Sequence, residues 1–253
     1  MEKLENRKFD EESLSKALRV NGARHLNYKW YTSMDRALAF LLTGNLYLTN
    51  GEKWNDLHDR RLVEEKHVYS MCLSSSTREN MAMWMLYGED RGRNGAIVNF
   101  LPSVMRTICN SSSIELGMFK ESRFDTKYTL IKEIDKYMIF LTDILYIDSC
   151  KNQLVKVTCG DDHFFAGQDA LEGEDVFYKN YAWAYEKECR LVLRLPHSWS
   201  MKAKKEDLTH VRLQIDEKQL RKMRERIVRS PVYAGSADFG KRSVLCGDVD
   251  WVI

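Results

Sequence analysis

The stretch Glu186-Lys187-Glu188-Cys189-Arg190-Leu191-Val192-Leu193-Arg194-Leu195 has the clearest strand pattern in the chain. Side chains alternate between the two faces of a strand, so these residues fall into two sets. One face would carry Lys187, Cys189, Leu191 and Leu193, and the other Glu186, Glu188, Arg190, Val192 and Arg194. The pattern predicts a half-exposed strand with charges along one face.

A compact strand–helix–strand unit is predicted near the N-terminus. Residues 28–33, Tyr-Lys-Trp-Tyr-Thr-Ser, are aromatic and β-prone. We expect Ser33 to cap a helix with its apolar face over 36–42, and Gly44 to end that helix. A second strand is predicted at 46–49.

The segment from 67 to 98 predicts another strand, a helix and a third strand. Residues 67–76 have a strand pattern, and Ser76 and Glu79 have the spacing of a capping box. The helix would run through Trp84 and Tyr87 and end at Gly88. Residues 96–98 are apolar without alternation, which indicates a central strand covered on both faces.

The remaining patterns complete a mixed α/β (α+β) fold around a split, mostly antiparallel sheet. Helices are predicted at 103–110, 129–142 and 216–229, and strands at 145–147, 154–157, 211–215, 232–234 and 249–253. Residues 160–180 fit either a helix or a loop. We expect a single domain over 1–253, with a polar, partly helical lead-in at 1–24, a core at 28–195, and a basic helix plus closing strands at 196–253.

Composition excludes several classes of protein. Only three prolines occur, and no linker divides the chain. The net charge of +2 does not mark a nucleic-acid binder, and the six cysteines form no CxxC pair, so we expect free thiols and no metal. The charged start and the lack of a long apolar run predict a cytoplasmic protein without a signal peptide or membrane span. Nucleotide-binding P-loop, Rossmann, hydrolase and zincin motifs are absent from the sequence.

Four segments, taken in order, resemble one bacterial family. They are the aromatic strand at 28–33, the Trp-Asn-Asp-Leu-His-Asp stretch at 54–59, the segments around 71–74, 83–87 and 95–100, and Trp-Ala-Tyr-Glu-Lys-Glu-Cys-Arg-Leu at 183–191. Over residues 28–195 the chain resembles the bacterial domain-of-unknown-function family 2971, although Leu57 replaces the usual proline and Trp30 stands where tyrosine is commoner. The resemblance implies a role in toxin or phage-defence systems.

The order of elements is also similar to that of ADP-ribosyltransferases. That similarity implies a first strand with a basic residue, a later strand with Ser, and a last strand with Glu-x-Glu. Here Lys29, Ser74 and Glu186-x-Glu188 would take these positions, although the usual Arg or His of the first strand is missing. NAD would then be the substrate.

Glu186, Glu188 and Arg190 are the main candidates for chemistry. Carboxylates can stabilise an oxocarbenium-like transition state, which cleavage of the nicotinamide–ribose bond also needs. Glu188 would be the catalytic carboxylate, Glu186 would steer the acceptor, and Arg190 would help to bind or orient NAD. The alternative is a solvated strand face with a Glu–Arg pair.

Other residues are candidates for binding the substrate. Trp84 and Tyr87 share a helix face and could stack on a planar ring, or could belong to the core. Asn55 and Asp56 could contact the substrate from a loop, or form a structural turn. The set is completed by Lys29, Tyr31 and Ser74; Lys29 could meet a phosphate or lie at the sheet edge with its ammonium in water.

The helix predicted from residue 216 is strongly basic. Lys218, Arg221, Lys222 and Arg224 could bind a nucleic acid or an acidic protein, or form a solvated face. We therefore expect an ADP-ribosyltransferase-like effector that modifies nucleic acid or protein. The alternatives are a non-enzymatic sensor that binds a nucleotide, RNA or a partner, and a metal-dependent nuclease using Asp56, Asp59 and Glu188.

Overall fold

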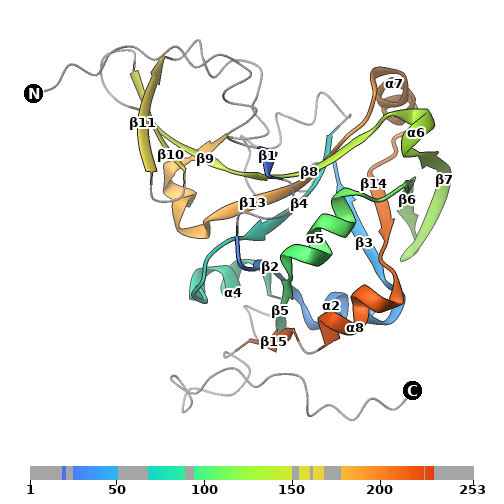
Figure 1. The fold of residues 1–253 in the computed structure, drawn as a ribbon, viewed down its shortest axis with the longest axis horizontal. Helices are drawn as coiled ribbons and strands as arrows, with labels where there is room; N and C mark the ends of the chain where they lie inside the picture. The colour runs from blue at the N-terminus through green and yellow to red at the C-terminus, as the bar shows by residue number, and fades with distance from the viewer. Residues whose placement is uncertain are drawn as a thin grey trace, which may run out of the picture.

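The computed structural model describes residues 19–20, 25–50, 68–88, 94–149, 154–159, 162–167, 178–224 and 226–230. An 11-stranded sheet dominates this part of the chain, and every ladder described in it is antiparallel. Its main path runs β1-β8-β13-β4-β3-β14-β6-β7, and β2, β5 and β15 branch from it (Figure 1). The predicted mixed α/β class with a mostly antiparallel sheet is confirmed.

Six of the eleven strands of the large sheet lie where the sequence predicts a strand. They are β1 (Arg19–Val20), β2 (Tyr28–Ser33), β3 (Asn45–Thr49), β4 (Val68–Ser74), β5 (Gly95–Phe100), β6 (Ser113–Lys120), β7 (Arg123–Ile131), β8 (Met138–Asp143), β13 (Glu188–Arg194), β14 (His210–Gln214) and β15 (Ile227–Arg229). A smaller sheet, in the order β11-β10-β9-β12, contains β9 (Leu145–Ser149), β10 (Leu154–Cys159), β11 (Asp162–Gly167) and β12 (Tyr178–Asn180).

The sheet branches at β4. Along one edge, β4 pairs with β13 over its whole length. Along the other edge, Ser70 lies opposite Thr49 of β3 and Ser74 lies opposite Lys29 of β2. Two different strands therefore share one edge of β4, and β2 leads onward to β5 and β15.

The helices are short. They are α2 (Met34–Thr43), α4 (Met81–Tyr87), α5 (Pro102–Cys109), α6 (Lys132–Asp135), α7 (His197–Lys205) and α8 (Glu217–Arg224), with a 3-10 helix η4 (Tyr181–Glu186). The predicted caps of α2 are confirmed: Ser33 Oγ accepts from the backbone N–H of Arg36, and Gly44 ends the helix with φ +69°. Asp216 also caps α8 through the N–H of Gln219.

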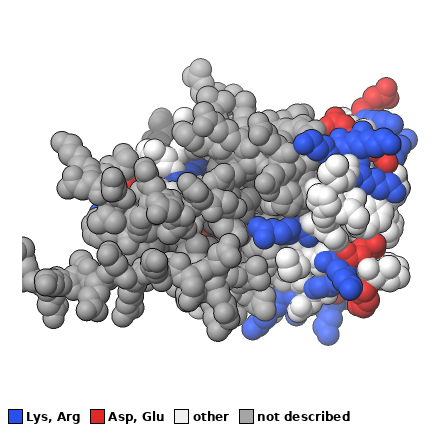
Figure 2. All heavy atoms as spheres, turned by 90° about the horizontal axis from the view of Figure 1, so that it is seen from above, with Lys and Arg blue, Asp and Glu red and all other residues white. Residues whose placement is uncertain are grey.

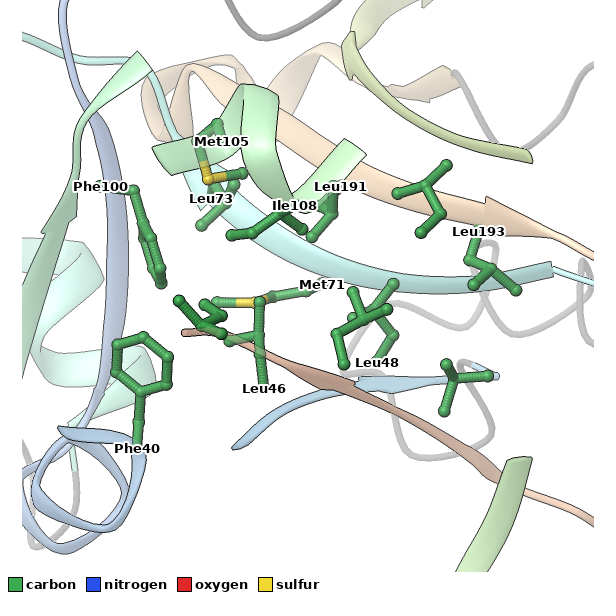
Figure 3. Packing of buried hydrophobic residues seen from close by; sticks show 14 of the residues in the cluster. Phe40, Leu46, Leu48, Met71, Leu73, Phe100, Met105, Ile108, Leu191 and Leu193 are labelled. Atoms are coloured by element: carbon green, nitrogen blue, oxygen red, sulfur yellow. The ribbon is translucent and has the colours of Figure 1, made fainter. Parts of the chain in front are cut away.

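The main core lies on one face of the large sheet. Figure 3 shows Met105 and Ile108 of α5 above Leu73, Leu191 and neighbouring strand residues, with the rings of Phe40 and Phe100 at one side. On each of these strands the core residues alternate with residues that face the other way. The opposite face of β2, β4 and β13 is therefore free to carry polar side chains.

Several predicted elements were wrong. Residues 129–142 form the end of β7, one turn of α6 and most of β8 instead of a helix, because hairpin pairing with β6 and pairing with β13 prevail over the helical spacing of Leu130, Ile134 and Tyr137. Asn80, and not Ser76, caps α4 by accepting from the N–H of Ala82. The helix from Asp216 ends at Arg224, and 227–229 join β5 as β15.

Other differences concern segments that the sequence left open or missed. Strands 113–120, 162–167 and 178–180 and the helix 197–205 were not predicted, and 19–20 form a strand within the expected helical lead-in. The predicted strands at 232–234 and 249–253 lie outside the described residues. The expectation of a single domain stays a prediction.

Candidate functional site

A row of polar residues crosses four neighbouring strands. Asn99 of β5 lies opposite Lys29 of β2, Lys29 lies opposite Ser74 of β4, and Ser74 lies opposite Glu188 of β13. Residues directly opposite one another in a sheet point to the same face. The register therefore brings three of the predicted site residues, Lys29, Ser74 and Glu188, to one face, opposite the main core.

Glu188 lies at the centre of a buried ionic cluster. Its Oε1 accepts from Arg190 Nε at 2.6 Å, and its Oε2 accepts from Lys179 Nζ at 3.0 Å. Lys179 also donates to Glu186 Oε2 at 2.6 Å. Glu186 and Glu188 are only 1 % and 4 % exposed, and Arg190 is fully buried. The predicted Glu–Arg pair is confirmed, but its location on a half-exposed, solvated strand face was wrong.

Glu186 reaches this cluster from a different element than predicted. It ends the 3-10 helix η4 and is followed by Lys187 with φ +44°, so β13 begins only at Glu188. The left-handed turn at Lys187 interrupts the alternation of the strand. Glu186 and Glu188 are thus brought together by Lys179, which contacts both carboxylates, and not by their spacing on one strand.

Hydroxyl and thiol groups complete the surroundings of the two carboxylates. Tyr87 donates to Glu186 Oε1 at 2.9 Å, and Tyr146 accepts from the backbone N–H of Glu188 at 2.7 Å. The Cys72 thiol hydrogen-bonds with Glu188. Ser74 Oγ donates to the backbone carbonyl of Glu186 at 2.7 Å, which ties β4 to the end of η4. We call Tyr87, Tyr146, Lys179, Glu186, Glu188 and Arg190 the carboxylate cluster.

The pKa values of Glu186 and Glu188 are shifted in opposite directions. Burial disfavours the ionised form of Glu188, but the charges of Arg190 and Lys179 outweigh it and lower the pKa of Glu188 to about 2. Burial prevails at Glu186, where it raises the pKa despite the contact with Lys179. The pKa of Lys179 is raised because both carboxylates outweigh the effect of its burial. The site therefore holds one firmly ionised carboxylate beside one that accepts a proton more readily.

One family model matches the part of the chain that contains the carboxylate cluster. Residues 83–191 match the family described as "Protein of unknown function (DUF2971)". This match covers less than half of the 253-residue chain, so the chain is similar to this family over that stretch. The predicted resemblance is confirmed over that stretch, and all six residues of the carboxylate cluster lie inside it. Searches of curated proteins and of solved structures found no match.

Two further predicted residues are buried beside Tyr87 of the carboxylate cluster. Tyr31 and Trp84 pack edge to face with ring centroids 5.2 Å apart, and Met83 and Ile97 complete this small apolar group. The Tyr31 hydroxyl accepts from the backbone N–H of Asn80. Trp84 is 1 % exposed, and its indole N–H has no hydrogen-bond acceptor in the part of the chain that the structure describes. Asn55 and Asp56 lie outside the described residues.

Lys29 is a buried basic residue. It is 7 % exposed, and no hydrogen bond or ion pair joins its ammonium to any residue that the structure describes. Burial lowers its pKa, and the negative charge of Glu79 opposes this shift. The sequence left two alternatives open for Lys29. The low exposure of Lys29 contradicts one of them, a location at the sheet edge with its ammonium in water.

The sequence analysis did not identify three residues that surround Glu186 and Glu188. Lys179 and Tyr146 lie in segments without a recognisable motif, and Cys72 looked like an ordinary buried thiol. The signal that could have identified Lys179 is the need for a counter-charge, because two carboxylates next to one buried strand cannot stay ionised without cations. Neither the spacing nor the strand pattern indicates which lysine supplies it.

The basic helix α8 lies apart in sequence from the DUF2971 stretch and is exposed. Its residues Leu220 and Met223 are buried, while Lys218, Arg221, Lys222 and Arg224 face solvent. Glu217 contacts Arg221 at 3.2 Å and Arg224 at 3.0 Å. In the view of Figure 2, Lys and Arg side chains are interspersed with Asp and Glu over the part that the structure describes.

Searches for two other kinds of site gave negative results within the described ranges. No three His, Cys, Asp or Glu residues lie close enough together there to hold a metal ion. None of the helices described is both long and apolar enough to cross a membrane.

Proposed function

We propose that this chain is a NAD-using, ADP-ribosyltransferase-like enzyme that acts as a toxin or phage-defence effector on nucleic acid or protein. The observation that supports it best is the row of Lys29, Ser74 and Glu188 on adjacent positions of β2, β4 and β13. A cation, a hydroxyl and a carboxylate on one sheet face are the groups that the sequence similarity to ADP-ribosyltransferases implies.

Glu188 would stabilise the positive charge that develops on the ribose. As the bond from C1′ to nicotinamide breaks, its electron pair leaves with the nicotinamide and the sugar becomes oxocarbenium-like. A carboxylate with a pKa of about 2 is ionised at neutral pH and can also accept from a ribose hydroxyl. The acceptor then forms a new bond to C1′, and Glu186, whose pKa is raised, is suited to take its proton.

Two buried donors favour a ligand rich in acceptor atoms. The ammonium of Lys29 and the indole N–H of Trp84 lack an acceptor among the described residues, which is costly for buried polar groups. Phosphate and amide oxygens of NAD could accept from both. Because Glu188 is 4 % exposed, the proposal requires the segment of β12 and η4 that carries Lys179 and Glu186 to move when the substrate binds.

The test is NAD consumption by the purified protein with cell lysate as the source of acceptor. Wild type is compared with Glu188→Gln and with Glu217→Gln, a matched change of an exposed glutamate on α8. We expect Glu188→Gln to abolish turnover and Glu217→Gln to retain it, while labelled NAD shows whether ADP-ribose is transferred or released. Full activity of a folded Glu188→Gln protein would contradict the catalytic role assigned to Glu188. The absence of NAD turnover by the wild-type protein would contradict the proposal that the chain is an enzyme.

A second candidate is a non-enzymatic sensor module that binds a nucleotide, RNA or a protein. The observation that favours it is the burial and complete ion pairing of Glu188, which also suits a purely structural cluster. This candidate predicts no turnover and little effect of Glu188→Gln on binding. It predicts a strong, salt-dependent loss of binding when Arg221, Lys222 and Arg224 are changed to Glu.

A further inference from the structure

One ammonium group, that of Lys179, lies between the two carboxylates of the cluster. Each carboxylate has one oxygen bound by another neighbour. Glu186 Oε1 accepts from the Tyr87 hydroxyl, and Glu188 Oε1 accepts from Arg190 Nε. The other oxygen of each carboxylate, Oε2, accepts from Lys179 Nζ, at 2.6 Å for Glu186 and 3.0 Å for Glu188. The two carboxylates therefore converge on a single position, and Lys179 occupies it.

An aromatic ring forms a further side of this position. The Lys179 ammonium lies 4.9 Å from the centre of the Trp183 ring, within the range of a cation–π contact. Trp183 is half-buried, and its ring lies 6.1 Å from that of Tyr185, which is 41 % exposed. Ring faces and carboxylates are the groups that attract organic cations most strongly. We call Glu186, Glu188 and Trp183 the cation site.

The cation site accommodates one positive charge. Glu186 and Glu188 bring two negative charges when both are ionised, and Arg190 balances one of them at Glu188 Oε1. Lys179 balances the other, with its side chain 5 % exposed. Without the ammonium a net negative charge would stay buried, which is costly. A ligand that displaces Lys179 must therefore bring one positive charge of its own.

Lys179 reaches the cation site from a separate sheet. It belongs to β12, a strand of three residues at the end of the small sheet, whereas Glu188 begins β13 of the large sheet. β12 pairs in parallel with β9, where Lys179 lies opposite Tyr146. A three-residue ladder at the edge of a sheet opens at a smaller cost than the strands of a core. Lys179 can thus leave the two carboxylates while β13 keeps its pairing with β4 and β8.

We propose that Lys179 is an autoinhibitory residue: its ammonium occupies a site for a small organic cation and has to leave before such a ligand can reach Glu188. The inference rests on the proposed function in one respect, since the nicotinamide ring of NAD carries the fixed positive charge that the cation site requires. Glu188 is only 4 % exposed while Lys179 is in place. Withdrawal of Lys179 makes Glu188 Oε2 and the face of the Trp183 ring available to a cation.

The experiment is isothermal titration calorimetry of the full chain with 1-methylnicotinamide, a cation with a fixed charge, and with neutral nicotinamide. Lys179→Met removes the internal cation, and Lys179→Arg keeps a positive charge at the same position. Lys205→Met is the control, because it removes the charge of an exposed lysine on α7. Lys179→Met should bind 1-methylnicotinamide at least about tenfold more tightly than wild type, and the other two variants should stay within about twofold. Neutral nicotinamide should not distinguish the proteins.

A measurement on the wild type keeps the test decisive if Lys179→Met fails to fold. Acetylation of lysine side chains by acetic anhydride, located by mass spectrometry, depends on their contact with solvent. An excess of 1-methylnicotinamide should raise the acetylation of Lys179 several-fold, because it transfers a buried ammonium to water, and should leave Lys205 unchanged. Acetylation of Lys179 that does not rise overturns the proposal.

NAD cleavage by the same proteins separates this inference from the proposed function. Tighter cation binding by Lys179→Met together with faster NAD cleavage supports both. Tighter cation binding without cleavage by any of the proteins supports the cation site and contradicts the NAD enzyme. NAD cleavage by proteins that bind 1-methylnicotinamide equally well, with or without Lys179, supports the enzyme and overturns the autoinhibitory role. Equal gains for the neutral and the cationic ligand also overturn that role, since the effect would then come from the size of the side chain rather than its charge.

Discussion

Replacement of Lys179 by Met tests the buried ionic cluster most directly. The Lys179 ammonium lies 2.6 Å from Glu186 and 3.0 Å from Glu188, and the side chains of all three residues are at most 5 % exposed. Removal of one partner from a buried ion pair costs about 3–5 kcal/mol, because the other charge stays buried without compensation. Glu188 keeps Arg190 as its partner, so Glu186 is the group left uncompensated. We therefore expect Lys179→Met to lower the free energy of unfolding by about 3 kcal/mol, the lower end of that range.

Urea unfolding at neutral pH, followed by tryptophan fluorescence, measures this loss. Lys218→Met is the control, because Lys218 is exposed on α8, and it should stay within about 0.5 kcal/mol of wild type. Adding Glu186→Gln to Lys179→Met removes the uncompensated charge and should restore part of the stability. The loss should also shrink as the pH falls, since the pKa of Glu186 is already raised by burial and protonation removes the charge.

The reasoning is refuted if Lys179→Met costs less than about 1 kcal/mol, as for a surface ion pair. It is also refuted if Glu186→Gln makes the Lys179→Met protein less stable, because the cost would then come from lost packing of the lysine side chain rather than from charge.

Three further predictions follow from other contacts. Glu188 has a folded pKa of about 2, below its ordinary value, so it adds stability at pH values above the ordinary pKa and loses it as the pH falls towards 2. Acid titration of wild type against Glu188→Gln should show this as a difference of about 3 kcal/mol that disappears in that window, and parallel curves would contradict it. Gly44→Ala should lower the free energy of unfolding by more than about 1 kcal/mol, because Gly44 has φ +69° and a Cβ would lie 2.6 Å from the Ile215 carbonyl; an unchanged urea midpoint would show that the turn can relax. Asn80→Ala should cost about 1 kcal/mol and Ser76→Ala clearly less, since Asn80 caps α4; thermal unfolding that ranks them in the opposite order would restore Ser76 as the cap.

The sequence predicted the elements whose local signals agree with their surroundings. β2, α2 and β3 were placed correctly, and so were the two caps of α2. Ser33 and Gly44 are strong local signals at the two ends of one amphipathic helix. The strand predicted at 186–195 was recognised, but the sequence did not show that Glu186 and Lys187 lie outside it. The left-handed turn at Lys187 depends on η4 packing against β9, which no local pattern of the sequence reveals.

The errors have the same physical origin. Residues 129–142 carry apolar side chains at helical spacing, yet β8 lies between β1 and β13, and pairing on both edges decides its structure. Ser76 and Glu79 have capping-box spacing, but Ser76 instead accepts from the N–H of Arg78, and the helix starts later, where Asn80 also donates to the carbonyl of Tyr185. Contacts between distant segments override local preference in each case.

A structural and a catalytic role of Glu188 can be distinguished by measuring stability and NAD cleavage separately. A structural Glu188 needs its two cations and nothing else, so Glu188→Gln would change the unfolding free energy and leave ligand binding intact. A catalytic Glu188 must also be reached by the substrate, which requires Lys179 to leave Glu186 or Glu188 during turnover. Lys179→Met would then destabilise the folded protein and yet ease access to Glu188. A fall in stability together with a retained or increased rate of NAD cleavage would fit only the catalytic role, because a purely structural cluster predicts no cleavage in either protein.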